Sequence, residues 1–536
     1  MPSPGTFAAR AGDLPSLPFA PRSSRRRSTV TSVDEVYSAE AGHHRRHGLV
    51  TAVVAWCAVV LVWALISGTV PISDEAHITF IAAALTTLGL IGAASMSREL
   101  GVRTALARLK LGPWMAIGFA VGFGLATLVW LGGNIEVYHG RVTGATLAPA
   151  AVVAGIGFVA FLISYRSTPR LFVVAGSKLD ARLRGRASVA TGAGGVWALW
   201  GVAAAAQAVG IAGGNLGYLS DPTAQLSTSS SLNAVVAAVT QLGLLATLVA
   251  AWRLAAHRSF ASALLLTWIA GTQVVLGLFS GGKEAVFIQF VAFVIGYSTK
   301  GRLRLGPVLL TGLVALFVVT PFITAYRSEV LTGSGRLTPA EAISSIDFTA
   351  LFADSTSGAS AGHSNRQAAE RLSRIGDIAI IVTETPRTVP FVSPLELLSG
   401  PVLGFVPRSI WPGKPVLDAG YQASIAYYGV PSSVHSSSAL TPYGDLYRHG
   451  GIIVVIGGMS LLGMFVRVVD DRDGGDATSD PRMIFLPMLL FTTLVKQEMD
   501  YLSLSASVVS IALAASLGAR IVSRQAVRRP ESFGQG

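Results

Sequence analysis

Apolar segments of nearly membrane-spanning length recur along this chain, and they constrain its fold more than any other feature. A transmembrane helix needs about 20 mainly apolar residues, because the hydrocarbon core of a bilayer is about 30 Å thick. Segments of roughly this length lie near residues 48–70, 77–96, 112–132, 147–165, 190–213, 232–252, 259–279, 284–299, 305–325, 450–468, 483–496 and 502–519. Only 13% of the 536 residues are charged, whereas soluble domains carry roughly 25%. The sequence therefore predicts an all-α, polytopic membrane bundle of about twelve transmembrane helices and excludes a soluble enzyme.

Positive charges alternate between successive loops, and this alternation predicts the topology. With the N-terminus inside, the loops predicted to be cytoplasmic hold Arg98, Arg103, Arg108, Lys110, Arg166, Arg170, Lys178, Arg182, Arg184, Arg186, Arg253, Arg258, Lys300, Arg302 and Arg304. The loops predicted to face outward, 71–76, 133–146 and 214–231, are poor in Lys and Arg. Cytoplasmic loops of membrane proteins are enriched in these residues. The net charge of +12 therefore indicates topology rather than nucleic-acid binding, and we expect both termini in the cytoplasm.

The predicted spans divide the chain into five parts. We expect a disordered basic cytoplasmic tail at 1–47, nine spans at 48–325, a large extracytoplasmic loop at 326–449, three spans at 450–519 and a basic cytoplasmic tail at 520–536. The loop holds two apolar stretches, near 376–383 and 395–406, that are too short or too interrupted by Pro and Gly to cross a bilayer. They favour short interfacial or re-entrant helices. Ordered loops of this length are usually functional, so we predict that the loop carries the active site.

Three motif-like features do not support cofactor or metal chemistry. The string GLFSGGK at 277–283 resembles a phosphate-binding loop, but Glu284 follows its lysine and no strand is predicted before it. The Asp-x-Asp pair at 471–473 resembles the metal clamp of some sugar-nucleotide enzymes, but its acidic loop is short, and we interpret it as a solvated charge run. The single cysteine, Cys57, cannot form an internal disulfide or a zinc cluster. We predict no cofactor and no metal site.

Polar residues at the predicted outer face remain as candidates for chemistry. They are Lys283 after a Ser-Gly-Gly turn, Arg327 after Tyr326, the string VPRSIWPGKP at 406–415 with Arg408, Trp411 and Lys414, His435, and the run Tyr443-Gly444-Asp445-Leu446-Tyr447. Cations at a membrane boundary commonly extend to the lipid headgroups, and a lone loop histidine is commonly structural. The proline-rich string is more specific, since its prolines and tryptophan form a stiff amphipathic element suited to the interface.

These motifs resemble those of the Wzy-type oligosaccharide repeat-unit polymerases, also called O-antigen or capsular polysaccharide polymerases. The resemblance is specific from about 277 to 465. The string at 406–415 is similar to the family's Pro-Arg…Trp-Pro-x-Lys-Pro element, and Tyr326-Arg327 to the arginine that opens its large outer loop. Lys283 stands where the family more commonly has arginine, and Asp445 where it commonly has glutamate.

The resemblance implies a metal-independent glycosyltransferase of GT-C type in the bacterial cytoplasmic membrane, with its active loop outside. Such an enzyme polymerises polyprenyl-diphosphate-linked oligosaccharide repeat units into a surface or extracellular polysaccharide such as a capsule. The resemblance also implies a chain-length regulator as a partner, besides the lipid bilayer. No nucleic-acid partner is expected.

The chemistry of that reaction suggests roles for the candidate residues. A departing polyprenyl diphosphate concentrates negative charge, which Arg and Lys can neutralise. A histidine, with an ordinary pKa of about 6.5, can accept the proton of a sugar hydroxyl. The predicted catalytic residues are His435, Arg408 and Arg327, and the predicted substrate-binding residues are Lys283, Lys414, Tyr443, Asp445 and Trp411. Asp445 is the alternative base.

Two other functions stay open. An O-antigen-ligase-like transferase, which passes a finished glycan to another acceptor, would use nearly the same loop chemistry. A transporter or flippase for lipid-linked sugars would place charged residues in mid-span, whereas most predicted spans have Ala, Val, Leu and Gly there. Lys496, Glu498 and Asp500 are exceptions, and we expect them to pair with each other or with the site.

Overall fold

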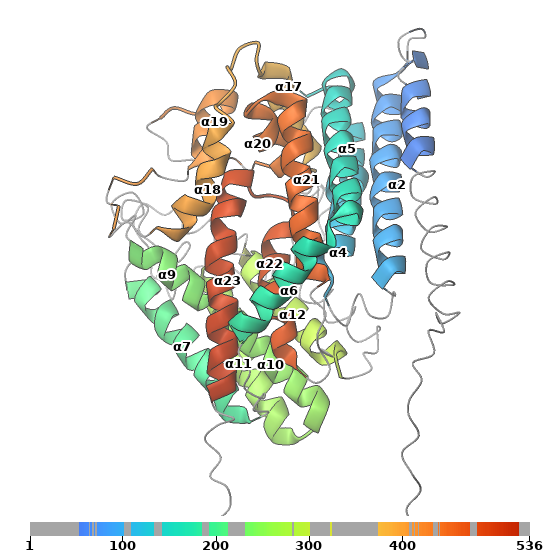
Figure 1. Cartoon of the computed structure of the whole chain (residues 1–536). Coiled ribbons are helices and arrows are strands. Elements are labelled where there is room, and N and C mark those ends of the chain that lie inside the picture. The colour runs from blue at the N-terminus through green and yellow to red at the C-terminus, as the bar shows by residue number, and fades with distance from the viewer. Residues whose placement is uncertain are drawn as a thin grey trace, which may run out of the picture. The chain divides into compact units, whose positions relative to one another are not determined.

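The structure is a computed structural model, and all regular secondary structure in its described part is helical (Figure 1). It describes residues 53–63, 65–66, 69, 72–100, 109–132, 142–184, 192–212, 231–280, 283–300, 322–323, 373–406, 410–411, 413–415, 418–432, 438, 440–471 and 480–524. Contacts divide the chain into two units, Met1–Thr51 and Ala52–Gly536. Every described residue lies in the second unit.

The second unit is a bundle of helices of very different lengths. In chain order its labelled helices are α2 (Asp74–Leu100), α4 (Leu111–Phe119), η1 (Ala120–Gly124), η2 (Leu125–Gly132), α5 (Gly144–Ser167), α6 (Arg170–Arg184), α7 (Ala193–Ala212), α9 (Ser231–Thr240), α10 (Leu242–His257), α11 (Phe260–Phe279), α12 (Lys283–Ser298), α17 (Ile375–Glu384), α18 (Leu395–Phe405), α19 (Ala419–Tyr428), α20 (Pro442–Arg448), α21 (Gly451–Asp470), η5 (Pro481–Ile484), α22 (Phe485–Leu494) and α23 (Tyr501–Arg524). A further short helix spans Val53–Trp63.

Eight helical stretches in the described residues are long and apolar enough to cross a membrane, in agreement with the predicted all-α multi-pass bundle. They are Asp74–Ser97, Leu111–Leu131, Gly144–Ser167, Ala193–Ala212, Val235–His257, Phe260–Leu278, Gly451–Asp470 and Tyr501–Ser523. Each overlaps one of the spans expected from the sequence. Several of these helices keep an apolar face exposed, which suits a lipid environment.

The other four predicted spans are not among these eight, so the total of about twelve stays a prediction. Three of them contain only shorter helices in the described residues, namely Val53–Trp63, α12, and η5 with α22. The fourth, 305–325, lies outside the described residues except for Phe322 and Ile323.

Glycines let the helices approach closely, because a residue without a side chain brings neighbouring backbones together. A Cβ atom at Gly118 of α4 would collide with the backbone carbonyl of Val495. A Cβ atom at Gly463 of α21 would collide with the carbonyl of Phe161 on α5. Helices α5 and α21 accordingly run side by side (Figure 1). This contact places the start of α21 against the core of the bundle. It does the same for α20, the short helix that precedes α21.

Between α12 and α21, the predicted loop contains helices that pack into the bundle. Helix α17 contacts α5 and α20, and its Ile375, Ile378 and Ile381 side chains are at most 1% exposed. The sequence favours an interfacial or re-entrant helix here, and the observed α17 is buried among other helices. The physical reason is that its apolar side chains cover most of the helix circumference, so that protein must surround it.

Helix α18 is the more exposed of the two short apolar helices. It packs against α23 through Gly400 and Gly404, where a Cβ atom would collide with α23. Its opposite side exposes Leu395 and Leu398, at 72% and 69%. A helix with one packed side and one exposed apolar side suits the interfacial position that the sequence predicts.

A π-helical turn, η1, is hydrogen bonded to the chain directly before α17. This turn, which is wider than an α-helical turn, lies between α4 and the 3₁₀ helix η2. The carbonyl oxygen of Gly122, inside this turn, accepts a hydrogen bond from the Arg374 backbone N–H at 3.0 Å. Because π turns leave backbone groups free for other partners, η1 attaches the chain directly before α17.

A buried carboxylate, Asp470 at the end of α21, joins three helices. Its Oδ1 accepts from the backbone N–H of Leu111 at 2.6 Å, and its Oδ2 from that of Gly112 at 2.8 Å. It thereby satisfies the first amide groups of α4. The Tyr165 hydroxyl of α5 donates to Oδ2 at 2.8 Å, and the Lys110 ammonium donates to the backbone carbonyl of Asp470. Asp470 therefore fixes α4 and α5 against α21.

The neighbouring Asp471 is only partly exposed, at 21%, and is ion paired with Arg467 at 2.6 Å. The sequence predicts a solvated charge run over 471–473. Asp471 departs from this expectation because Arg467 lies one helical turn before it. The other residues of that run lie outside the described part of the chain.

Replacement of Asp470 should destabilise the bundle strongly. We expect Asp470→Ala to cost about 3–5 kcal/mol, because the first two amides of α4 and the Tyr165 hydroxyl would lose a buried charged hydrogen-bond partner. Asp471→Ala is the matched control and should cost roughly 0–1 kcal/mol, as for a partly exposed ion pair. Thermal and denaturant unfolding of the detergent-purified protein measures both. Equal losses for the two variants would contradict a central role for Asp470.

Candidate functional site

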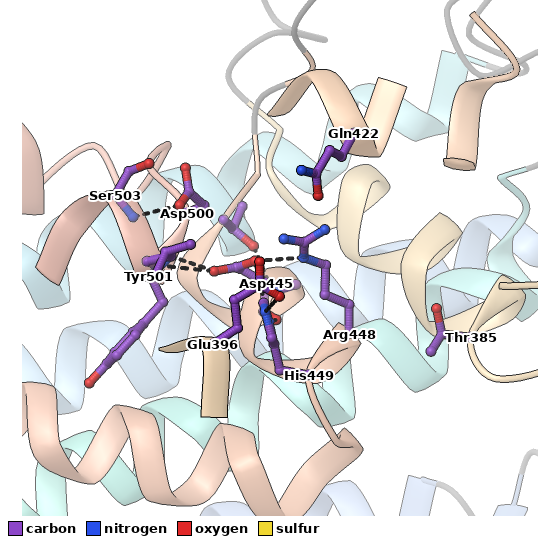
Figure 2. Close-up of polar contacts among 12 residues, drawn as sticks. Thr385, Glu396, Gln422, Asp445, Arg448, His449, Asp500, Tyr501 and Ser503 are labelled. Atoms are coloured by element: carbon purple, nitrogen blue, oxygen red, sulfur yellow. Dashed lines mark hydrogen bonds and ion pairs between the residues drawn. The ribbon is translucent and has the colours of Figure 1, made fainter. Parts of the chain in front are cut away.

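The short helix α20 connects the α17–α19 segment to α21 and carries most of a cluster of buried polar side chains (Figure 2). It begins at Pro442, whose missing N–H suits a first helical position, and the Thr441 hydroxyl accepts from the backbone N–H of Gly444 at 3.1 Å. After α20 the chain turns at Gly450 and Gly451, whose φ angles of 151° and 70° favour glycine. The polar residues therefore lie directly before a membrane-spanning helix.

Asp445 is the centre of this cluster and is fully buried. Its Oδ1 accepts a hydrogen bond from Arg448 Nε at 2.7 Å. Its Oδ2 accepts from the backbone N–H groups of Tyr501 at 2.8 Å and Leu502 at 3.3 Å (Figure 2). Because Tyr501 and Leu502 begin α23, the carboxylate satisfies the N-terminal amides of a span far along the chain.

Arg448 is 4% exposed and is fixed by the bond from its Nε atom to Asp445. Within the described part of the chain, its two terminal nitrogens make no hydrogen bond. Figure 2 shows them directed toward Gln422 of α19 and away from His449. A guanidinium offers a planar fork of donors that matches two phosphate oxygens. Arg448 is therefore a fixed cation with two donor groups available for an anion.

His449 follows Arg448 and is also fully buried. Its Nδ1 lies 2.7 Å from the backbone carbonyl oxygen of Asp445. Because a carbonyl oxygen can only accept, Nδ1 carries the proton, and in the neutral ring Nε2 is left with a lone pair. Among the described residues Nε2 has no hydrogen-bond partner, and the Glu396 carboxylate of α18 lies 3.8 Å away. This nitrogen can accept a proton from a hydroxyl group.

Tyr443 was selected from the sequence as a sugar-contacting residue, and the structure places it in the core. It is 1% exposed and packs against the rings of Phe119 and Phe123, with centroids 5.9 and 5.0 Å away. Burial raises the pKa of its hydroxyl well above the ordinary value. Gly157 of α5 also lies against it, where a Cβ atom would be 2.8 Å from the tyrosine ring. A contact between Tyr443 and a sugar stays a prediction.

Lys414 closes the proline-rich string that the sequence singles out. Its Nζ donates to the backbone carbonyl of Val406 at 3.1 Å, and its backbone N–H donates to that of Trp411 at 3.1 Å. The ends of the string are therefore held together. Ile410 and Trp411 are 74% and 41% exposed, so the described part of the string presents two apolar side chains outward.

The remaining predicted site residues are only partly covered by the structure. Lys283 is the first residue of α12 and is half-buried. Its neighbour Glu284 is ion paired with Lys496. His435, Arg408 and Arg327 lie outside the described residues, so their roles stay predictions. The described site consequently rests on α18 and α20, with α19 beside it.

Sequence analysis did not select Arg448, His449 or Glu396. A signal for the first two was present, because they stand between the Tyr443–Tyr447 run and the glycine pair that opens a span. Two titratable residues at the start of a membrane span cost free energy unless they are paired, so such residues are commonly functional. Glu396 carries no such signal, since it lies in a different apolar helix and reaches His449 only in the folded chain.

The charged residues after α22 pair with other elements and not with each other. Lys496 is ion paired with Glu284 of α12. Glu498 is ion paired with Arg374, the residue directly before α17. The sequence left open whether they pair mutually or with the site. The first pair joins the segment after α22 to α12, and the second joins that segment to the start of α17.

Asp500 caps α23 beside the cluster. Its Oδ1 accepts from the backbone N–H of Ser503 at 2.6 Å (Figure 2). Burial raises the pKa of Asp500 above its ordinary value, and the nearby Asp445 carboxylate raises it further. Two acidic groups therefore lie close together at the start of this span.

One family model matches the chain over residues 219–473, and it is described as a domain of unknown function (DUF8712). No curated protein and no solved structure matches. The matched stretch begins before α9 and ends just after α21, so it contains α18, α19 and α20. It leaves out α23, whose first amides Asp445 binds.

The raised pKa of Asp500 predicts that the difference in stability between wild type and an Asp500→Asn variant depends on pH. The folded protein binds the Asp500 proton more tightly than the unfolded chain, so this stabilisation is present at acidic pH and lost as pH rises through the raised pKa. Asn at this position can still accept from Ser503. We therefore expect Asp500→Asn to be at least as stable as wild type at pH 7, with its relative advantage falling toward pH 4.

Asp500→Ala provides the comparison, because it loses the cap and should cost about 0.5–2 kcal/mol. Thermal unfolding in detergent between pH 4 and pH 8 measures the three proteins. A pH-independent difference between Asp500→Asn and wild type would disprove the coupling to Asp500.

Proposed function

We propose that this protein is a membrane-embedded glycosyltransferase that joins oligosaccharide units carried on a polyprenyl diphosphate, as the repeat-unit polymerases that it resembles do. The observation that carries the proposal is the pairing of two different functional groups on adjacent residues. Arg448 offers two donor nitrogens fixed by Asp445, and His449 offers a buried Nε2 lone pair. One group suits a departing diphosphate and the other an incoming hydroxyl.

The proposed reaction needs both groups. The acceptor hydroxyl oxygen attacks the anomeric carbon of the donor sugar, and its proton passes to His449 Nε2. The bond between that carbon and the diphosphate oxygen breaks, and the electron pair leaves with the polyprenyl diphosphate. Arg448 stabilises the negative charge that develops there. Attack from the face opposite the leaving group inverts the anomeric centre.

The placement of the cluster fits a lipid-linked substrate. It lies at the start of the spans α21 and α23, where a polyprenyl tail can remain in lipid while its diphosphate reaches the protein. The string closed by Lys414 exposes Ile410 and Trp411, and tryptophan suits the membrane interface. Arg408, Arg327 and Lys283 are proposed as further cations for the diphosphate. In the proposed topology both termini are cytoplasmic and the cluster is extracytoplasmic, in a bacterial inner membrane.

A deletion strain tests the function. Lipid-linked glycans are extracted and sized, with the wild-type gene restored as a control. We expect single repeat units to accumulate on the polyprenyl carrier and long polymer to disappear. Long polymer that still forms on the carrier but does not reach its final acceptor would indicate a ligase. Precursor trapped on the cytoplasmic face would indicate a flippase. An unchanged glycan profile would reject the polymerase, ligase and flippase functions alike.

Substitution at His449 and Arg448 tests the site. His449→Asn keeps an amide N–H that can replace the Nδ1 donor to Asp445 but removes the base, and it should lower the transfer rate about 10²–10⁴-fold. Arg448→Ala should lower it about 10²–10³-fold. Product formation by the purified protein in lipid nanodiscs, with lipid-linked oligosaccharide as substrate, gives the rates.

Arg467→Ala is the matched control, because it removes an arginine from the opposite end of α21, where Arg467 pairs with Asp471. We expect this variant to keep most of its activity. Unfolding temperatures of all variants separate lost chemistry from lost stability. Full activity of a folded His449→Asn protein would refute the assignment of the base.

A further inference from the structure

A cavity of about 390 Å³ lies between α7, α9, α10, α11, α12 and α22. Its polar lining is mainly uncharged, and it includes Gln207, Gln241, Gln273, Gln289, Thr240 and Thr492. Three of these glutamines lie within membrane-spanning stretches. Its volume falls within the roughly 300–1,000 Å³ of small-molecule sites. Polar side chains inside a membrane bundle are costly and are typically functional, so this cavity needs an explanation beyond packing.

Two of the glutamines hold each other in place. Gln207 Nε2 donates to Gln273 Oε1 at 2.9 Å, and Gln273 Nε2 donates to Gln207 Oε1 at 3.2 Å. Their residues are 8% and 4% exposed. Gly243 of α10 makes room for this pair, since a Cβ atom there would lie 2.5 Å from Gln273 Oε1. Each amide keeps a second N–H and a second lone pair for another partner.

The other two glutamines have unused hydrogen-bonding groups. Gln289 Oε1 accepts from the Thr247 hydroxyl at 2.8 Å, and within the described residues its amide nitrogen has no partner. Gln241 stands at the junction of α9 and α10, and its buried Oε1 also has no partner among the described residues. Both donor and acceptor groups are therefore available to a molecule in the cavity.

The charge of the lining restricts the ligand. Glu284 is the one acidic residue among the described residues of the lining, and it is ion paired with Lys496. Among the described residues that line the cavity, none carries the basic side chain needed to bind a phosphate. Leu244, Leu276 and Ile288 contribute apolar surface to the wall. An anion would lack a partner here, and a purely apolar tail would leave the glutamine amides unsatisfied.

We propose that this cavity is a binding site for an uncharged sugar residue. Amide groups both donate and accept, as sugar hydroxyls do, while the leucine and isoleucine side chains can cover the C–H faces of a sugar ring. The site is distinct from the Asp445 cluster and faces α22 through Leu489 and Thr492. This inference requires only the cavity, so it does not rest on the proposed transferase activity.

Saturation-transfer difference NMR on the full-length protein in lipid nanodiscs tests the proposal. Sugar-based detergents must be removed first, because their headgroups would compete. The probes are glucose, galactose, mannose and N-acetylglucosamine, with glucose 1-phosphate and glucuronate as charged comparators. We expect saturable binding of at least one neutral probe and at least tenfold weaker binding of the charged ones.

Two variants locate the binding. Gln241→Leu removes an amide without breaking a described hydrogen bond, and the double variant Gln207→Leu with Gln273→Leu removes both members of the pair together. Each should weaken neutral-sugar binding at least tenfold. The control is Gln497→Leu, since Gln497 binds the backbone of Met115 outside this cavity. Absence of saturable neutral-sugar binding, equal binding by all variants, or a preference for the charged probes would each overturn the proposal.

Discussion

Two buried carboxylates satisfy the first amide groups of helices to which they do not belong, and the packing of the bundle depends on them. Asp470 at the end of α21 binds the start of α4, and Asp445 just before α21 binds the start of α23. Neither lipid nor a tightly packed bundle supplies water to helix ends. Each carboxylate also places a negative charge at the positive end of a helix dipole. Helix α21 is thereby connected at both of its ends to other helices.

The carboxylate of Asp445, which satisfies the first amides of α23, also determines the geometry of the candidate site. The Asp445 carboxylate fixes Arg448, while the backbone carbonyl of Asp445 determines which nitrogen of His449 carries the proton. One residue therefore orients both a cation and a base, and it does so while bound to α23. A small displacement of α23 would reach the site through this carboxylate, even though α23 lies outside the stretch matched by the family model.

The membrane bundle could be predicted from the sequence because its signals are local. The length of an apolar segment requires no knowledge of contacts, whereas the topology that the alternation of Lys and Arg predicts stays a prediction. The site could not be assembled in this way. The sequence motif directed attention to Tyr443 and Asp445, but the partners of Asp445 at Tyr501 and Leu502 are distant in sequence. Each glutamine of the cavity likewise looks like an isolated polar residue in its own helix, since spacing does not show which helices meet.

The π turn η1 has a consequence for how related chains can differ. A π turn holds one residue more than an α turn over nearly the same rotation, so removal of one residue from Ala120–Gly124 would convert it to an α turn and leave η2 in nearly its present orientation. Trp130 of η2 would therefore still face Ser373, whose hydroxyl accepts a hydrogen bond from the Trp130 indole at 3.0 Å. The change would instead return the Gly122 carbonyl to the helix, and Arg374 would lose the backbone partner that it has in the π turn. A homologue with one residue fewer here would keep its bundle and lose this attachment of the chain directly before α17.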